Sequence, residues 1–221
     1  MKQTVVITGA NRGIGLELVR EYLRRGCEVI GLCRETSAEL DASGARVIDG
    51  VDVADAPSAQ TAARKLKGVA VDILINNAGI FEDDRLGRLD YQMLQRQFEV
   101  NALGPLHITE ALLDNLGKGS KIALITSRMG SIADNGSGGY YGYRMSKAAL
   151  NAAGKSLAVD LRGRGIAVAI LHPGFVQTRM VDFAGDIPPA TAAKRLAQRI
   201  DEIDLKTTGS FRHSSGEALP W

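Results

Sequence analysis

Short, continuous apolar runs alternate along the chain with longer stretches in which apolar residues recur every three or four positions. The runs cover residues 4–8, 27–33, 45–50, 71–79, 120–127 and 166–174, and a shorter one lies near 209–212. The helical pattern covers residues 13–26, 55–67, 90–116, 143–165 and 190–202, and Pro105 predicts a kink or a new start within the third helix. Strands that are apolar throughout are typical of a parallel sheet buried on both faces.

The alternation of strand and helix predicts an α/β fold, a Rossmann-type doubly wound parallel sheet of about seven strands with helices on both faces. No linker, repeat or low-complexity segment divides the sequence, so we expect one domain spanning residues 1–221. In such sheets ligands bind beyond the carboxyl ends of the strands, near the point where the strand order reverses. Residues with functional chemistry should therefore follow the ends of strands.

The segment TGANRGIG, residues 8–15, follows the first strand and opens the first helix. Glycine permits a tight turn and lets the backbone approach a ligand where a Cβ would collide. The helix N-terminus behind it offers free N–H groups to a pyrophosphate, so Gly9, Gly13 and Gly15 predict a dinucleotide site. The alternative is a glycine turn that binds nothing.

Two arginines favour NADP(H) over NAD(H) as the dinucleotide. The second strand ends in LCRE, which places Arg34 where an NAD-binding protein would have an acidic residue for the ribose hydroxyls. Arg12 lies in the glycine loop itself, and two guanidinium groups can hold a 2′-phosphate by bidentate hydrogen bonds. Both could instead be ordinary surface charges, and Glu35 could bind the ribose, so NAD(H) stays possible.

The segment GGYYGYRMSK, residues 138–147, places three tyrosines ahead of a lysine at the start of a predicted helix. Residues four apart share a helix face one turn apart, a condition that only Tyr143 meets with Lys147. An ammonium group nearby would lower the pKa of the phenol and make it a usable general acid or base. Ser127, at the end of the fifth strand, could hold a substrate oxygen. The alternative is a solvated Tyr–Lys pair.

Composition and charge exclude several classes of protein. Of the 221 residues 45% are apolar, the formal net charge is +2, and no block of like charges predicts a nucleic-acid partner. No apolar run approaches the ~18 residues of a membrane-spanning helix, and the N-terminus lacks the pattern of a secretory signal, so we expect a cytoplasmic protein. Cys27 and Cys33 show no CxxC spacing and predict reduced thiols rather than a metal site.

These residues together resemble the short-chain dehydrogenases/reductases over nearly the whole chain. The resemblance is carried by TGANRGIG, NNAG at 76–79, Asn101, Ser127, Tyr143 with Lys147, and PGFVQT at 173–178. A looser resemblance, in the chain's end and its short segment after Thr178, is to the small C-factor-like and sniffer-like carbonyl reductases.

The resemblance implies a role for each matching position. Tyr143 would donate the proton in carbonyl reduction, Ser127 would orient the carbonyl, and Lys147 would bind the nicotinamide ribose. Asn101 would hold a water that joins Lys147 to solvent. Asp52 would contact the adenine amine, and Val176 and Thr178 would fix the carboxamide. The full set implied for the dinucleotide is Gly9, Asn11, Arg12, Gly13, Ile14, Gly15, Arg34, Asp52, Val53, Asn77, Ala78, Gly79, Tyr143, Lys147, Pro173, Gly174, Val176 and Thr178.

The sequence departs from the family pattern in two places. Sixteen positions separate Ser127 from Tyr143, more than is common, and the surplus lies in ADNGSGG at the border of the site. The segment at about 179–190 would be a short lid over the substrate, which predicts an open site with relaxed substrate choice. Family members usually oligomerise, and the small apolar segment 148–159 favours a dimer unless it packs only on its own sheet.

The leading hypothesis is therefore an NADPH-dependent reductase of aldehydes or ketones, reversible as an alcohol dehydrogenase. The alternative from another class is a dinucleotide-binding signalling protein of the C-factor type that requires no turnover.

Overall fold

The computed structural model describes residues 2–221, and within them seven strands form one parallel sheet. The strands are β1 (Thr4–Thr8), β2 (Glu28–Leu32), β3 (Arg46–Ile48), β4 (Val71–Asn76), β5 (Leu116–Ile125), β6 (Ala167–His172) and β7 (Ser210–His213). Their spatial order is β3-β2-β1-β4-β5-β6-β7, so the strand order reverses between β1 and β4. The predicted doubly wound α/β fold is confirmed.

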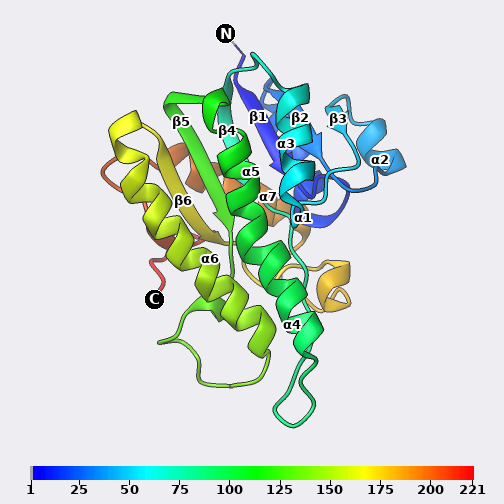
Figure 1. Cartoon of the computed structure of the whole chain (residues 1–221), viewed down its shortest axis with the longest axis vertical. Coiled ribbons are helices and arrows are strands. Elements are labelled where there is room, and N and C mark those ends of the chain that lie inside the picture. The colour runs from blue at the N-terminus through cyan, green and yellow to red at the C-terminus, as the bar shows by residue number, and fades with distance from the viewer. Residues whose placement is uncertain (1) are drawn as a thin grey trace.

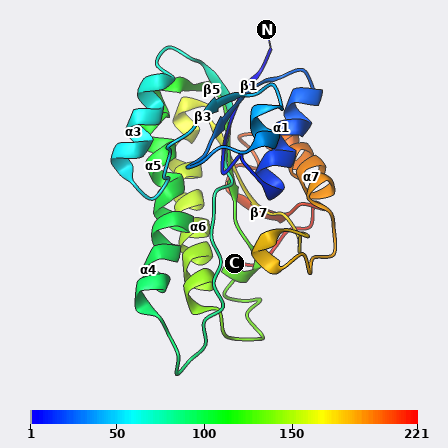
Figure 2. The same ribbon diagram turned by 90° about the vertical axis from the view of Figure 1, so that its right-hand side faces the viewer.

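Helices cover both faces of the sheet, as Figures 1 and 2 show. They are α1 (Gly13–Arg24), α2 (Ala38–Asp41), α3 (Ala56–Lys65), α4 (Tyr91–Phe98), α5 (Gly104–Ala111), α6 (Tyr141–Asp160) and α7 (Pro189–Glu202). In Figure 2, α3, α5 and α6 lie on one side of the sheet and α1 and α7 on the other. The four-residue α2 was not predicted, because one turn is too short to show a helical pattern.

The apolar strands divide their side chains between the two faces. In β1, Val6 packs in the core beneath α3, α5 and α6, whereas Val5 and Ile7 pack in the core beneath α1 and α7. Successive side chains of a strand point to opposite faces, so a strand that is covered on both sides must be apolar throughout. The same division recurs in β4, β5 and β6, which explains the uninterrupted runs in the sequence.

The helix predicted at 90–116 is two helices joined by a π-helical turn. The turn spans Glu99–Leu103, between α4 and α5. Pro105 lies in the first turn of α5, a position where proline is well tolerated although it has no N–H group. Beyond α5, a single 3₁₀ turn (Leu113–Asn115) leads into β5, which begins at Leu116, earlier than predicted. The π-turn matters for function because it carries Asn101.

The carboxyl ends of the strands and the loops that follow them form one end of the molecule. In both views the loops before α4 and before α6 lie side by side beyond the sheet at this end. Short 3₁₀ turns at Arg128–Gly130 and Arg179–Val181 belong to the same end, and another follows α6 at Arg162–Arg164. No helix within residues 2–221 combines the length and apolar character needed to cross a bilayer.

Candidate active site

The N-terminal turns of α6 carry Tyr143 and Lys147 on one face. The Nζ atom of Lys147 lies 5.7 Å from the centre of the Tyr143 ring and donates a hydrogen bond of 2.9 Å to the carbonyl oxygen of Ile125. Lys147 is only 4% exposed, and burial lowers its pKa to about 8. Its ammonium group therefore gains and loses its proton close to neutral pH.

The phenol of Tyr143 is not acidified, contrary to the sequence-based expectation. Burial raises the pKa of Tyr143 to about 12, and its hydrogen bond with Ser127 offsets that effect only in part. Lys147 does not counter it, because its ammonium group is bonded to the Ile125 carbonyl rather than to the phenol oxygen. Tyr143 is consequently protonated at neutral pH.

Ser127 follows β5 and caps the 3₁₀ turn Arg128–Gly130, where its Oγ accepts a 3.1 Å hydrogen bond from the Met129 amide. Gly130, in the same turn, packs on the backbone of Lys147 so closely that a Cβ would lie 2.7 Å from the carbonyl carbon. A glycine is required there, and it brings the serine turn against α6.

Asn101 projects from the π-turn and ties the loop after β4 to α6. Its Oδ1 accepts a 2.8 Å hydrogen bond from the Ile80 amide, and its Nδ2 donates to the Ile80 carbonyl at 2.8 Å and to Ser146 Oγ at 3.0 Å. A Cβ on Gly79 would lie 3.1 Å from Asn101 Oδ1 and 3.6 Å from Lys147 Nζ. Both amide hydrogens are committed, so any further hydrogen bond to this side chain must be accepted by Oδ1. π-helical turns are often found at functional sites.

The glycine loop has the geometry that a dinucleotide pyrophosphate needs. Gly9 and Gly13 have φ angles of +64° and +55°, and a Cβ on Gly15 would overlap the carbonyl oxygen of Gly9. Within the described chain, the side chain of the N-cap residue Arg12 makes no hydrogen bond that caps α1. The first turn of α1 contains no acidic residue. The N–H groups of that turn remain able to receive an anion, so the residues fit the implied cofactor.

The loop after β4 is fastened to the end of β1 at the reversal of strand order. Thr8 Oγ1 accepts 3.0 Å hydrogen bonds from the amides of Asn77 and Ala78, and Asn77 Nδ2 donates to the Thr8 carbonyl at 3.0 Å. These bonds hold NNAG beside the glycine loop. Sequence reasoning missed Thr8, although a threonine directly before the glycine loop was the available signal.

Arg12 and Arg34 are both exposed, and in the described chain neither forms an ion pair. Asn11 joins their two loops, because its Nδ2 donates a 2.8 Å hydrogen bond to the carbonyl oxygen of Glu35. The two guanidinium groups are thus free for a phosphate. Ile14 lies in the first turn of α1 and packs, partly buried, against the core beneath that helix.

Asp52 and Val53 follow β3, and each has a partner that sequence reasoning missed. Asp52 Oδ2 accepts a 2.8 Å hydrogen bond from Arg96 on α4. Partial burial favours a higher pKa for Asp52, but the Ala54 amide and Arg96 outweigh it and hold that pKa below its usual value. His107 Nδ1 lies 3.1 Å from the carbonyl oxygen of Val53. The Asp52 carboxylate is already ion-paired, which restricts how it could meet an adenine amine.

The segment after β6 folds back over the glycine loop. Gly174 has a φ of +98°, Val176 is bridged to Ile187, and a Cβ on Gly13 would lie 3.5 Å from Thr178 Cγ2. Pro173 begins this segment. The residue before it, His172, is largely buried, and burial lowers the pKa of His172 to about 3, so that its ring is neutral at neutral pH. Thr178, directly before the proposed lid, therefore lies beside the glycine loop.

An aromatic cluster forms one wall beside Tyr143. The Phe81 ring stands edge-on to Tyr143 with centroids 5.0 Å apart and lies 5.6 Å from the Tyr140 ring. The guanidinium of Arg85 lies 5.8 Å from the Tyr140 ring centre. Tyr140, whose role the sequence left open, is thus a wall residue, and Phe81 was not foreseen because it is distant in sequence.

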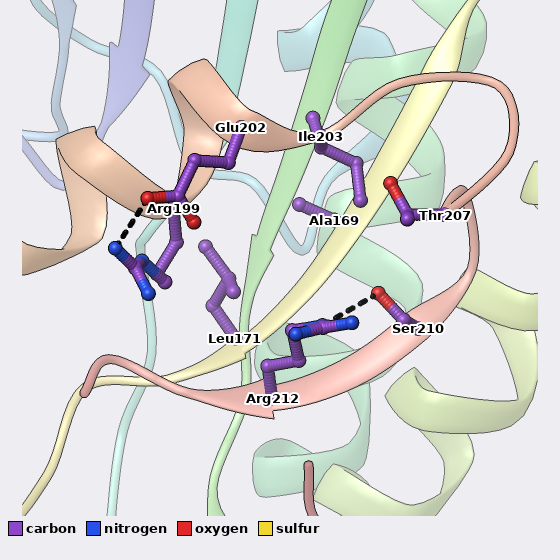
Figure 3. A pocket seen from close by; sticks show the side chains of 8 residues that line it. All are labelled: Ala169, Leu171, Arg199, Glu202, Ile203, Thr207, Ser210 and Arg212. Atoms are coloured by element: carbon purple, nitrogen blue, oxygen red, sulfur yellow. Dashed lines mark hydrogen bonds and ion pairs between the residues drawn. The ribbon is translucent and has the colours of Figure 1, made fainter. Parts of the chain in front are cut away.

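Two surface hollows in the described part of the chain lie outside this cluster. One, of about 250 Å³, is lined by Asp83, Arg85 and Arg88 next to the aromatic wall. The other, of about 210 Å³, lies between α7, β6 and β7 on the opposite face of the sheet (Figure 3). Both arginines that line it already donate hydrogen bonds, Arg199 to Glu202 and Arg212 to Ser210. Residues 2–221 contain no group of three or more acidic, cysteine or histidine side chains placed to hold a metal ion.

The family model for short chain dehydrogenases matches residues 3–186. The chain belongs to the short-chain dehydrogenase family. It is accordingly an oxidoreductase of that family.

Two curated relatives are similar to this dehydrogenase. The 1-hydroxy-2-glutathionyl-2-methyl-3-butene dehydrogenase of Rhodococcus sp. (strain AD45) is 42% identical, with 99% of each chain covered. The C-signal of Myxococcus xanthus is 44% identical over 68% of this chain and 93% of its own length.

Solved carbonyl reductases share the fold of the dehydrogenase over its whole length. The carbonyl reductase Sniffer of D. melanogaster superposes with a TM-score of 0.92, 29% identity and complete coverage of both chains. The NADPH-bound carbonyl reductase from chicken fatty liver superposes with a TM-score of 0.90 and 27% identity, over 100% of this chain and 99% of that one. The expected likeness to C-factor-like and sniffer-like proteins is confirmed.

Proposed function

We propose that this dehydrogenase is an NADPH-dependent reductase of aldehydes or ketones that also runs in reverse on alcohols. One observation carries the proposal: Tyr143 hydrogen-bonds to Ser127 and lies one helical turn from the buried Lys147. The free arginines Arg12 and Arg34 and the likeness to an NADPH-bound carbonyl reductase support the choice of cofactor.

Tyr143 acts as the general acid in reduction. Its raised pKa keeps the proton on the phenol at neutral pH, so the proton is available when negative charge develops on the carbonyl oxygen. An alkoxide is a stronger base than a phenolate, so the transfer is favourable even from a weakly acidic phenol. Ser127 holds the same oxygen by a hydrogen bond. The nicotinamide, when bound, supplies the hydride.

Lys147 and Asn101 serve to return a proton to Tyr143 after the transfer. The Lys147 ammonium, with a pKa of about 8 against about 12 for Tyr143, returns a proton to the phenolate left after the transfer. Asn101 holds the loop after β4 against α6 and leaves Oδ1 to accept a hydrogen bond from water on the path to solvent. In the reverse direction the same residues remove a proton from an alcohol.

A second candidate function is oxidation of an alcohol that carries a glutathionyl group. It is favoured by the Rhodococcus relative, whose name states that activity, and by Arg85 and Arg88 beside the aromatic wall. Glutathione carries carboxylates, which guanidinium groups bind well. The third candidate, a signalling protein without turnover, is favoured by the likeness to C-signal.

Tyr143→Phe tests the proposed function. The change removes the transferable proton and keeps the ring against Phe81, so we expect kcat for carbonyl reduction to fall by more than about 100-fold. The Kd of NADPH should stay within about twofold, and Tyr141→Phe serves as the control. The measurement is NADPH oxidation over a panel of aldehydes and ketones, with the glutathionyl alcohol and NADP⁺ as the reverse assay.

The three candidates give different results in that panel. Steady oxidation of NADPH by carbonyls supports the reductase, and turnover confined to the glutathionyl alcohol supports the second candidate. Cofactor binding without any turnover favours the signalling protein. Undiminished turnover by Tyr143→Phe would exclude the mechanism.

Three coarser proposals accompany the activity. We propose that residues 1–221 act as one domain, that residues of about 179–190 form a short lid, and that the protein works as a cytoplasmic homodimer. The lid proposal is supported by the bridge between Val176 and Ile187, which folds the segment back on itself, and by the place of Thr178 beside Gly13 directly before it.

A further inference from the structure

Asp84, in the loop between β4 and α4, lies against the start of α6. Its side chain is buried, with 6% of the residue exposed. The carboxylate accepts hydrogen bonds from the amides of Tyr141 and Gly142, the second at 2.9 Å. Its backbone carbonyl accepts a third, of 2.9 Å, from the Tyr140 amide. Three successive N–H groups at the start of α6 therefore donate hydrogen bonds to one residue, which lies 57 positions from Tyr141 in the sequence.

This contact replaces a local helix cap. The N-cap residue of α6, Tyr140, has left-handed backbone angles (φ +53°, ψ +42°) and provides no side-chain cap. Such a conformation is strained for a residue with a side chain and persists only where its surroundings hold it. The helix N-terminus also favours a negative charge. Within residues 2–221 no lysine, arginine or histidine forms an ion pair with Asp84, so the helix end is its partner.

The fit around Asp84 is tight. Gly142 has no Cβ, and one there would lie 2.5 Å from Gln97 Nε2 and 3.2 Å from Asp84 Oδ2. Gln97 is itself fully buried and accepts a 3.2 Å hydrogen bond from the Glu82 amide, in the same loop as Asp84. The loop and the first turn of α6 are thus fixed against each other from both sides.

The residue after this junction is Tyr143. Phe81, three positions before Asp84, packs edge-on against the Tyr143 ring. The contacts of Asp84 with the backbone and of Phe81 with the ring therefore flank the phenol. A displacement of about 1 Å in a reacting group can lower a rate about 100-fold.

We propose that Asp84 is a positioning residue that holds the phenol of Tyr143 in its reactive place by anchoring the first turn of α6. The proposal rests on the proposed function, in which Tyr143 donates the proton. In this role Asp84 acts through the backbone of α6.

The test compares three variants of the full chain in the NADPH oxidation assay. Asp84→Ala removes the acceptors, and we expect kcat to fall about 10- to 100-fold while the Kd of NADPH changes less than about twofold. Asp84→Asn keeps one oxygen acceptor but faces the second backbone N–H with an NH2 group, so we expect a kcat between those of Asp84→Ala and the wild type. The matched control is Asp90→Ala, because Asp90 caps α4 with bonds from the amides of Gln92 and Met93. It should lower Tm by a similar amount and leave kcat unchanged.

The outcomes separate positioning from stability. A fall in kcat in Asp84→Ala that Asp90→Ala does not share, with an intermediate kcat in Asp84→Asn, supports the proposal. Equal kcat values in Asp84→Ala and Asp90→Ala overturn it. If Asp84→Ala does not fold, Gly142→Ala replaces it, because the added methyl group intrudes on the same junction and keeps Asp84. The proposal then requires the same selective loss of kcat in Gly142→Ala. A normal kcat in that variant overturns the proposal. Loss of activity in Tyr143→Phe together with a normal kcat in Asp84→Ala rejects this inference alone, whereas an active Tyr143→Phe rejects the proposed function.

Discussion

At the scale of single residues, burial decides the protonation of Tyr143 and Lys147. Their spacing on α6 suggested that the ammonium would acidify the phenol. In the structure the desolvation of each group dominates instead, so the pKa of Tyr143 rises and that of Lys147 falls. A phenol that keeps its proton is suited to reduction, and a lysine that titrates near neutral pH is suited to resupply it.

The lowered pKa of Lys147 predicts a pH dependence of stability. The pKa is about 8 in the folded protein and about 10.5 in the unfolded chain, so between these values the unfolded chain binds more protons. The free energy of unfolding contributed by Lys147 must therefore rise with pH across that window, by about 2 kcal/mol between pH 7 and pH 10.

Urea denaturation at these two pH values checks this prediction, with Lys147→Met as the reference that lacks the titrating group. The difference in unfolding free energy between wild type and variant should shift in favour of the wild type at pH 10. A difference that does not change with pH would contradict the lowered pKa.

At the scale of elements, the loops after successive strands assemble the site. The serine turn after β5 meets α6 through Gly130, and the π-turn between α4 and α5 presents Asn101 to the loop after β4. The loops after β1 and β2 are joined by Asn11 and present Arg12 and Arg34. The loops after β1 and β2 are short, so the strands that precede them set their positions, whereas the long loops after β4 and β5 are held by contacts with α6.

The two loops with arginines predict the cofactor preference. Arg34→Ala should raise the KM of NADPH about 10-fold or more and leave the KM of NADH unchanged, because a charge-assisted hydrogen bond to the 2′-phosphate is worth about 1.5–3 kcal/mol. Arg64→Ala, an exposed arginine on α3, is the control. An equal effect on both cofactors would show that Arg34 does not read the phosphate.

At the scale of the whole molecule, the sheet order places β1 and β4 side by side, where the strand order reverses. The loops that follow these two strands therefore lie next to each other.

The outer helices α4 and α6 pack against each other and carry exposed apolar side chains, among them Tyr91, Phe98, Met145 and Val159. In the segment 148–159, Gly154 packs on Leu124 and Ile170 of its own sheet, so only part of that segment is available to a partner.

The exposed apolar residues of α4 and α6 predict a dimer through these helices. Light scattering should give twice the chain mass of 23.6 kDa. Val159→Asp together with Phe98→Asp should give the monomer mass, because a charge at an apolar interface is costly to bury. Ile132→Asp, an exposed apolar position outside α4 and α6, should remain dimeric. A monomeric wild type would refute this prediction.

The sequence by itself determined the fold and the identity of the chemical groups. Apolar strands, helical periodicity and glycine positions are local properties, so the doubly wound sheet, the glycine loop and the Tyr143–Lys147 pair could be read from them. Only the tertiary structure decided the protonation of that pair, because desolvation depends on every neighbour. It also decided which residues hold the site: Thr8, Phe81, Asp84 and Arg96 lie far in sequence from the residues they contact, and no local pattern encodes such pairings.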